Sequence, residues 1–429
     1  MKQNMKVGFV SLGCSKNLVD TEMMIGLFKK NGYDIVNSPE VADIIVINTC
    51  GFIESAKEEA INTILEMAEY KKDNCKYLIV TGCLVERYKE ELIKAIPEVD
   101  LFIKFSEYET IWEQIENLIN SNIKDGKLEF LDRVISTGKN YAYLRIAEGC
   151  NNFCTFCAIP YIRGRFKSRK IEDILQEAKK LADDGIKELI VIAQDTTKYG
   201  IDIYGKPELA KLLHELSKID GIEWIRFLYA YPETITDELI EEVKNNEKIC
   251  KYFDIPMQHI SDNILKKMNR KSTGASIKNL IRKLRKEIPE VIIRSTLMVG
   301  FPGETEEDFE ELYAFVKWAK LDKLGCFTYS KEEGTAAYKM ENQVYPMTKK
   351  KRYNKIMALQ QKISEENMKK HIGKTLKVLV EQKGIGRSYM DVPDIDGVVY
   401  IKGESNINSF ENCKITGIKE YDLIGEVVK

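Results

Sequence analysis

The sequence predicts an α/β protein with three structured parts: a doubly wound parallel sheet, then a partial (β/α)6 barrel, then a small β barrel. Over residues 5–330, short apolar runs alternate with helical periodicity, which is the pattern of parallel sheets. From residue 375 onward, short β segments alternate with glycines, which is typical of a small barrel. The length of 429 residues fits about three domains.

The N-terminal part contains four apolar runs that are short enough for buried strands. They cover residues 7–12, 44–48, 77–81 and 101–103, and helical patterns at 18–30, 55–70, 88–96 and 107–119 separate and follow them. Strand–helix alternation of this kind predicts a parallel, doubly wound sheet. A polar stretch with Gly126 and Gly138 then interrupts the pattern. We therefore place an N-terminal domain at residues 1–122 and a linker at 123–139.

The central part repeats the alternation six times. Predicted strands are 141–147, 188–193, 224–228, 252–255, 291–298 and 324–328, with helical patterns at 171–184, 206–218, 237–245, 277–286 and 306–320. Six such units fit a partial (β/α) barrel, which we place at residues 140–368, and a long charged helix is predicted at 348–370. Active sites of barrel enzymes gather at the carboxyl ends of the strands.

The C-terminal part changes to four β segments, at residues 376–381, 398–401, 413–418 and 423–427. Repeated glycines between them predict a small β barrel over residues 371–429. Its eight Lys or Arg and nine Asp or Glu residues give a formal charge of −1. Phosphate contacts favour a basic surface, so a basic protein partner suits this domain at least as well as RNA does.

The composition describes an ordinary globular chain without a membrane span. No apolar stretch approaches the roughly eighteen residues that a span needs, and no signal peptide pattern opens the chain. Ten cysteines without such a signal favour the reducing cytoplasm and a metal or redox role over disulfides. The net charge of −2 argues only weakly against an RNA substrate.

Three cysteines lie within one eight-residue loop, Cys150, Cys154 and Cys157, which we call the loop trio. Their spacing allows three thiolates to converge on an iron–sulfur cubane and leaves one iron open, whereas cubanes commonly take four thiolates. The alternative is a zinc knuckle, which needs four ligands. None of His214, His259 and His371 is near the loop in sequence, so zinc would need a distant fourth ligand.

Three further cysteines, Cys14, Cys50 and Cys83, each follow a predicted strand of the N-terminal domain, and we call them the auxiliary trio. Carboxyl ends of parallel strands share one edge of a sheet, where ligands of doubly wound folds bind. The three thiols should therefore meet at that edge. Glycines directly before Cys14 and Cys83 fit tight turns around a ligand. The alternative is that each cysteine is a small buried residue.

The loop trio resembles the cysteine motif of the radical S-adenosylmethionine (SAM) enzymes. A three-cysteine N-terminal domain, this barrel and a C-terminal domain similar to TRAM together resemble the methylthiotransferases, over residues 7–428. The resemblance implies an enzyme in which each trio holds a 4Fe-4S cluster. One SAM would methylate a sulfide at the auxiliary cluster, and a second SAM, cleaved at the loop cluster, would supply the radical that activates a C–H bond.

Four stretches resemble the RimO-like branch of this family more than the MiaB-like branch. They are residues 11–20 (SLGCSKNLVD), 194–196 (QDT), 254–259 (DIPMQH) and 386–391 (GRSYMD). The resemblance implies methylthiolation of an aspartate β-carbon in small-subunit ribosomal protein 12, with flavodoxin or ferredoxin as electron donor. The alternatives are a tRNA adenosine 2-methylthiotransferase, as in the MiaB-like branch, and a non-catalytic electron-transfer protein with two clusters.

By the same resemblance, five residues would contact SAM: Phe156, Gln194, Asp195, Val299 and Gly300. Each has a structural alternative. Phe156 could simply pack beneath the cysteine loop, and Gln194 and Asp195 could form a polar turn after a strand. Glycines at the 299–304 segment would let the backbone approach a ligand, but Thr305 and Asp308 also predict a capping box for the next helix.

Two charged runs have no assigned role. Five basic residues follow the loop trio within eight positions: Arg163, Arg165, Lys167, Arg169 and Lys170. They could offset cluster charge, steer an acidic substrate side chain or mark a solvated helix entry. Asp391, Asp394 and Asp396 form the clearest acidic run, either as a solvated turn or as a surface for a basic partner.

Overall fold

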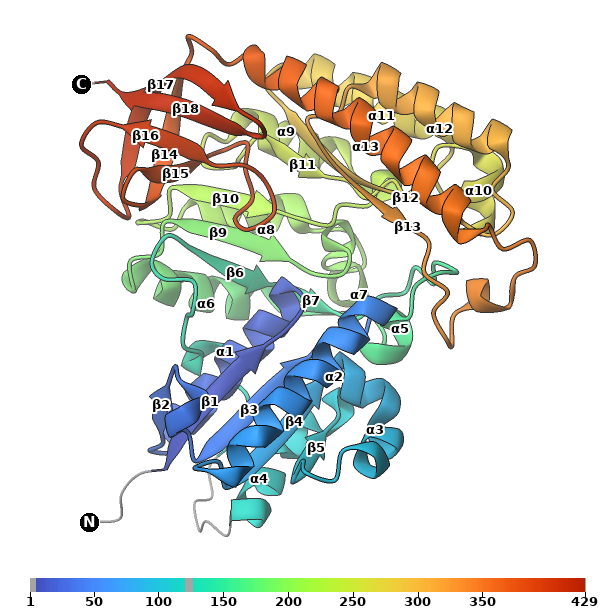
Figure 1. Ribbon diagram of the computed structural model, residues 1–429. Helices are drawn as coiled ribbons and strands as arrows, with labels where there is room; N and C mark the ends of the chain where they lie inside the picture. Colours follow the sequence, from blue (N-terminus) through green and yellow to red (C-terminus); the bar gives the residue numbers. More distant parts are fainter. Residues whose placement is uncertain (1–4, 120–125, 429) are drawn as a thin grey trace. The chain divides into compact units, whose positions relative to one another are not determined.

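A computed structural model describes residues 5–119 and 126–428 (Figure 1). It divides into two compact units, the first being Met1–Ser136, Glu148–Asn151 and Cys157–Phe166, and the second Thr137–Ala147, Asn152–Phe156 and Lys167–Lys429. Parts of the predicted domains 1–122 and 371–429 and of the linker 123–139 lie outside the described residues, namely 1–4, 120–125 and 429. The domain boundaries remain predictions.

The first unit contains a five-stranded, all-parallel sheet in the order β2-β1-β3-β4-β5 (Figure 1). Its strands are β1 (Lys6–Ser11), β2 (Asp34–Val36), β3 (Ile44–Thr49), β4 (Tyr77–Gly82) and β5 (Leu101–Ile103). Its helices are α1 (Ser15–Lys30), α2 (Glu54–Glu69), α3 (Cys83–Ala95), α4 (Ile111–Ile119) and α5 (Ile159–Ile162), with 3-10 turns at Pro39–Val41, Tyr70–Lys72, Phe105–Thr110 and Phe130–Asp132.

Helices cover both faces of this sheet, because its central strands are apolar on both sides. In β3, Ile44 and Val46 pack into a core with residues of α1 and α4. Ile45 and Ile47 face the opposite way, into a second core with residues of α2 and α3. Side chains that alternate along a strand point to opposite faces, so an unbroken apolar run needs two helical layers. The predicted doubly wound sheet is confirmed.

The second unit contains six parallel strands in sequence order. They are β6 (Tyr141–Arg145), β9 (Glu188–Ile192), β10 (Trp224–Phe227), β11 (Tyr252–Asp254), β12 (Ile292–Val299) and β13 (Lys323–Thr328). Two three-stranded sheets, β6-β9-β10 and β11-β12-β13, are joined where Ile225 donates to the Lys248 carbonyl and accepts from the Cys250 amide, at 2.8 and 2.9 Å. This arrangement is the predicted partial (β/α)6 barrel.

Helices that connect these strands, and α13 after the last of them, cover the outside of the two sheets (Figure 1). They are α6 (Ile171–Asp183), α7 (Ile201–Tyr204), α8 (Leu209–Ser217), α9 (Asp237–Asn245), α10 (Asp262–Lys267), α11 (Gly274–Glu287), α12 (Glu306–Ala319) and α13 (Pro346–Lys369). Short strands β7 (Ala147–Glu148) and β8 (Lys167–Ser168) flank the cysteine loop, and 3-10 turns occur at Thr196–Lys198, Pro232–Thr234 and Ala336–Lys339. No helix of the described chain has the length and apolar character of a membrane span.

The C-terminal part is a closed barrel in the order β14-β15-β16-β18-β17. Its strands are β14 (Thr375–Gln382), β15 (Ile385–Ser388), β16 (Val399–Lys402), β17 (Phe410–Lys419) and β18 (Asp422–Val427). The small barrel is therefore confirmed, with one strand, β15, that the sequence pattern did not predict. β15 is only four residues long and contains Gly386, whose added Cβ would lie 2.5 Å from the Leu379 carbonyl oxygen.

The acidic run of this barrel contacts the first residues of three strands of the (β/α)6 barrel. Asp391 pairs with Lys323 of β13 at 2.7 Å. The hydroxyl of Tyr141 in β6 donates to Asp394 at 2.9 Å, and that of Tyr252 in β11 donates to Asp396 at 2.6 Å. The side chains of Asp391 and Asp396 are only 5% and 4% exposed, whereas Asp394 stays exposed. The run is therefore only in part a solvated turn. It fixes the small barrel against the amino ends of the strands, opposite the edge at which barrel active sites form.

Candidate functional site

The auxiliary trio lies at the carboxyl ends of three neighbouring strands. Cys14 comes just after β1 and directly before α1, Cys50 directly follows β3, and Cys83 is the first residue of α3 after β4. Because β1, β3 and β4 are adjacent in the sheet, the three cysteine-bearing loops share one edge. Cys14 is exposed, Cys50 is half-buried and Cys83 is buried. The arrangement matches the shared edge expected from the sequence.

Two glycines allow these loops to come close together. Gly13 has a φ of +90°, and a Cβ added there would lie 2.8 Å from the Cβ of Cys50. Gly82 has a φ of +104°, and its added Cβ would lie 2.4 Å from the carbonyl oxygen of Thr49. Both the conformation and the space thus require glycine directly before Cys14 and Cys83.

The three thiols also interact electrostatically. Burial raises the pKa of Cys83 to about 12, the nearby Arg163 guanidinium opposes this rise, and the charges of Cys14 and Cys50 add to it. Burial likewise raises the pKa of Cys50, and Cys14 raises it further. Binding to a metal would stabilise these thiolates, because a coordinating thiol is deprotonated. The three thiols therefore fit a metal-bound group, whose positive charge would offset the cost of burying thiolates.

No group of three His, Cys, Asp or Glu side chains in the described part of the chain is arranged to hold a single metal ion. A cubane places each thiolate on a different iron, so its ligand sulfurs stand farther apart than those around one ion. The lack of a single-ion site among the described residues is therefore compatible with a cluster at the auxiliary trio. Whether the six cysteines are cluster ligands remains a prediction.

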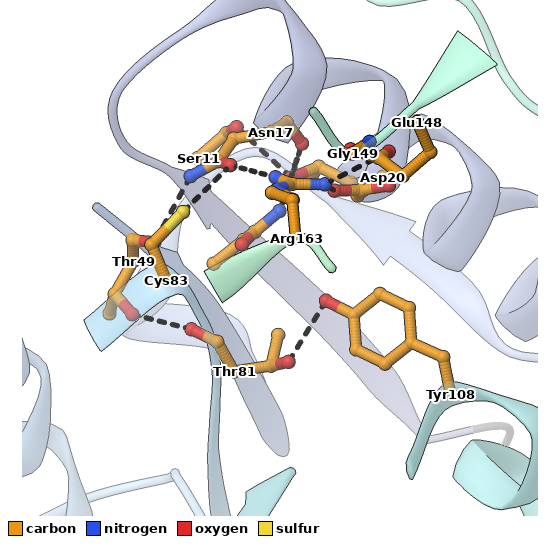
Figure 2. Close-up of polar contacts among 12 residues, drawn as sticks. Ser11, Asn17, Asp20, Thr49, Thr81, Cys83, Tyr108, Glu148, Gly149 and Arg163 are labelled. Atoms are coloured by element: carbon orange, nitrogen blue, oxygen red, sulfur yellow. Dashed lines mark hydrogen bonds and ion pairs between the residues drawn. The ribbon is translucent and has the colours of Figure 1, made fainter. Parts of the chain in front are cut away.

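A buried arginine of the basic run lies beside the auxiliary trio, although in the sequence it follows the loop trio. Arg163 forms ion pairs with Asp20 at 2.7 Å and Glu148 at 3.3 Å, and it donates a hydrogen bond to Asn17 (Figure 2). Its side chain is only 4% exposed, so for this member of the basic run a solvated position is wrong. The sequence marked Arg163 only as one of five basic residues that could offset cluster charge, because two of its partners, Asp20 and Asn17, lie more than a hundred residues away.

The loop trio occupies a turn that is held by side chains and backbone at both ends. Phe153 has a φ of +49°. The side-chain amide of Asn269 donates to the Phe153 carbonyl at 2.9 Å, which fixes this unusual conformation. The amide of Cys150 donates to the carbonyl of Gly164 at 3.1 Å. Cys154 is buried, with the guanidinium of Arg270 3.9 Å from its sulfur. Arg270 is not among the residues that the sequence singled out, and it places a positive charge beside this loop cysteine.

Asp195 follows β9 and is fully buried. It accepts hydrogen bonds from Asn152, inside the cysteine loop, at 2.8 Å and from Thr197 at 2.7 Å, and Lys198 lies 3.7 Å away. Burial raises the pKa of this carboxyl, which the hydrogen bonds and Lys198 partly offset. Asp195 therefore connects the strand end to the loop that carries Cys154. Gln194 is half-buried at the same strand end.

Val299, Gly300 and Phe156 come together at the carboxyl end of β12. Val299 is the last residue of this strand, and Gly300 follows it with a φ of +74°. Phe156 packs edge-on against Phe301, with ring centroids 6.4 Å apart. The predicted capping box at Thr305 is also present, so it coexists with the turn. Four of the five predicted SAM-contact residues thus lie at strand ends. The fifth, Phe156, packs beside the end of β12. Their contacts with SAM remain predictions.

His259, which follows β11, is fully buried and should make the fold sensitive to acid. Its Nδ1 accepts a hydrogen bond from the Ser261 backbone amide at 3.1 Å. Burial lowers the pKa of His259 to about 3; the charge of Asp308 opposes this shift and that of Arg352 adds to it. Below the unfolded pKa of about 6.5, the unfolded chain gains a proton that the folded chain does not. The free energy of unfolding should therefore fall by up to about 1.4 kcal/mol per pH unit.

The thermal midpoint at pH 7.5 and 5.5 checks this prediction. The variant His259→Gln should show a smaller drop between these two values than the unmodified chain, whereas His214→Gln, at an exposed position, serves as the matched control. Equal acid sensitivity in the His259→Gln variant and the unmodified chain would contradict the prediction.

Comparison with known proteins covers the whole chain. Residues 144–316 match the radical SAM superfamily, residues 6–104 the uncharacterized protein family UPF0004, and residues 372–428 the TRAM domain. A relative from Alkaliphilus oremlandii, called "Ribosomal protein uS12 methylthiotransferase RimO", is 64% identical to this chain, and the match covers 99% of both chains. A relative of the same name from Clostridium perfringens is 54% identical to this chain, and the match covers 98% of both chains.

Solved structures with the same fold are much more distant in sequence. The radical SAM methyltransferase TsrM from Kitasatospora setae, with cobalamin and a [4Fe-4S] cluster bound, has a TM-score of 0.59 at 12% identity, covering 76% of this chain and 72% of that one. The cobalamin-dependent radical SAM enzyme OxsB has a TM-score of 0.53 at 14% identity, covering 85% and 56%. At such identities the likeness supports the fold alone.

Proposed function

Because the chain belongs to the family of RimO-type radical SAM methylthiotransferases, we propose that it adds a methylthio group to the β-carbon of an aspartate in ribosomal protein uS12. The observation that carries the proposed chemistry is the position of Cys14, Cys50 and Cys83 at adjacent strand ends. The substrate is proposed from relatives that match this chain from end to end.

The two trios are the proposed holders of two 4Fe-4S clusters. The auxiliary trio supplies three thiols at one sheet edge, and the loop trio supplies three within eight residues. When bound, these clusters with two molecules of SAM would supply a methylated sulfur and an adenosyl radical for insertion at a C–H bond. Flavodoxin or ferredoxin is the proposed electron donor, and the reducing conditions that free thiols need suggest the cytoplasm.

The chain's own residues would orient SAM and keep water away. Gly300 gives the backbone beside Val299 a turn that only a residue without a side chain adopts easily. Asp195 is 0% exposed and accepts two side-chain hydrogen bonds, so its carboxylate is held in one orientation. Fixed polar groups in a water-excluded site act more strongly than in water, and exclusion of water protects reactive intermediates.

Mass spectrometry of uS12 and tRNA from a strain lacking this gene tests the substrate. The methylthio group should disappear from uS12 and remain on tRNA, and the unmodified gene should restore it. A copy encoding Cys83→Ala should fail to restore it if this thiol holds the auxiliary cluster. Loss of the tRNA modification alone would instead identify the tRNA adenosine as the substrate.

A further inference from the structure

One buried amide touches all three loops that carry the auxiliary trio. Asn17, in the first turn of α1, is 0% exposed. Its Nδ2 donates to the carbonyl of Leu12, two residues before Cys14, at 2.9 Å, and to the carbonyl of Thr49, directly before Cys50, at 3.0 Å. Its Oδ1 lies 3.7 Å from the sulfur of Cys83 (Figure 2). The amide therefore sets the spacing of the three loops.

Arg163 and the two carbonyls together determine which way this amide points. A guanidinium can only donate hydrogen bonds, and its Nη2 donates to the Oδ1 of Asn17. The oxygen of Asn17 must then face Arg163, which leaves its nitrogen for the two carbonyls. Arg163 is itself held by Asp20 and Glu148, and its guanidinium stacks on the ring of Phe105 with 3.9 Å to the centroid.

Arg163 also brings a positive charge to the thiols. Its guanidinium lies close enough to Cys83 and Cys14 for their charges to interact. A cubane held by three thiolates becomes more negative when it is reduced, and nearby charge and hydrogen bonds to the sulfurs set its reduction potential. A buried guanidinium at this place should therefore favour the reduced form.

We propose that Arg163 is a positioning residue for the auxiliary cluster: it helps to orient the Asn17 amide that spaces the three cysteine loops, and it raises the reduction potential by its charge. This inference rests on the proposed function. Arg163 follows Cys157 by six residues in the sequence. The segment that begins with the loop trio thus helps to build the site of the auxiliary trio.

The test uses the full chain with Cys150, Cys154 and Cys157 all replaced by alanine, so that only the auxiliary site can hold a cluster. After anaerobic reconstitution, iron content and the midpoint potential are measured, the latter by electron paramagnetic resonance during a redox titration. Arg163→Met should lower the reduced-to-oxidised ratio at a fixed potential about tenfold, which equals about 59 mV for one electron. Arg163→Lys keeps the charge and should restore much of the ratio.

Two further variants separate this role from a merely structural one. Asp20→Asn removes a negative charge from the same group and should shift the potential in the opposite direction, which general damage would not do. Lys167→Met removes an exposed charge of the same basic run and should leave the potential unchanged. If Arg163→Met does not fold, as judged by circular dichroism, Arg163→Lys and Asp20→Asn still carry the test.

The outcomes distinguish the two proposals. Equal potentials and iron contents for Arg163→Met and Lys167→Met would overturn the role of Arg163 alone. Shifts of the same sign for Arg163→Met and Asp20→Asn would also overturn it. If the parent chain with Arg163 intact holds no cluster, the proposed auxiliary site fails, and this inference fails with it.

Discussion

Replacing Cys14, Cys50 and Cys83 together by alanine should lower the iron content from about eight to about four per chain. Methylthio transfer should be lost, whereas reductive cleavage of SAM to 5′-deoxyadenosine should continue, because the loop trio is unchanged. Iron and sulfide are measured after anaerobic reconstitution, and 5′-deoxyadenosine by chromatography after chemical reduction. This separation of two activities is the largest effect that the arrangement predicts.

Cys75 provides the matched control. It is also a buried cysteine of the first unit, 3% exposed, but it lies just before the start of β4, at the opposite end of the strand that leads to Cys83. Its thiol donates to the Tyr77 carbonyl at 3.3 Å. Cys75→Ala should retain about eight irons. Retention of eight irons by the triple variant would show that the auxiliary trio holds no cluster.

The position of the auxiliary trio could be predicted from the sequence because it depends on local pattern alone. Each of the three strands β1, β3 and β4 was recognised as a short apolar run, and parallel strands bring their carboxyl ends to one edge. The strand β2 (Asp34–Val36) was missed, since three residues with one exposed give no clear pattern. The omission did not affect the site, because β2 pairs only with β1 at the outer edge.

The charged residues could not be predicted, because their roles depend on partners far away in the sequence. Arg163 and Asp20 are 143 residues apart, and Tyr141 and Asp394 are 253 apart. A run of like charges is usually solvated, and nothing local distinguishes Arg163 or Asp394 from that average. Only the folded chain shows that Arg163 belongs to the cysteine site and Asp394 to the contact between the two barrels of the second unit.

Glu188 is the centre of the most deeply buried ion-pair group at that contact. It is the first residue of β9 and binds Arg226 of β10 at 2.8 Å and Arg387 of β15 at 2.6 Å. The three side chains are 0%, 0% and 1% exposed, respectively. Burial raises the pKa of Glu188, but the two arginines outweigh it and lower the pKa overall. Glu188 thus binds guanidinium groups from both barrels, and Arg387 also pairs with Glu381 of β14 at 2.8 Å.

Glu188→Gln should lower the free energy of unfolding by about 3–5 kcal/mol, because it leaves the buried Arg226 guanidinium without its carboxylate partner, whereas Arg387 keeps Glu381. The measurement is the shift of the urea midpoint of the full chain at neutral pH, followed by circular dichroism. Glu366→Gln, which breaks an exposed pair with Lys320 at 2.9 Å, is the control and should change the midpoint little. Equal midpoints for the two variants would contradict the prediction.

The loss of stability in Glu188→Gln should also depend on pH. Because the pKa of Glu188 is lower in the folded chain than its ordinary 4.5, the stabilisation is complete above that value. It is lost as the pH falls through the lower, folded pKa, where the carboxylate becomes protonated and resembles the glutamine. The gap between the unmodified chain and Glu188→Gln should therefore narrow in acid. A gap that stays constant as the pH falls well below 4.5 would mean that shape rather than charge accounts for the loss.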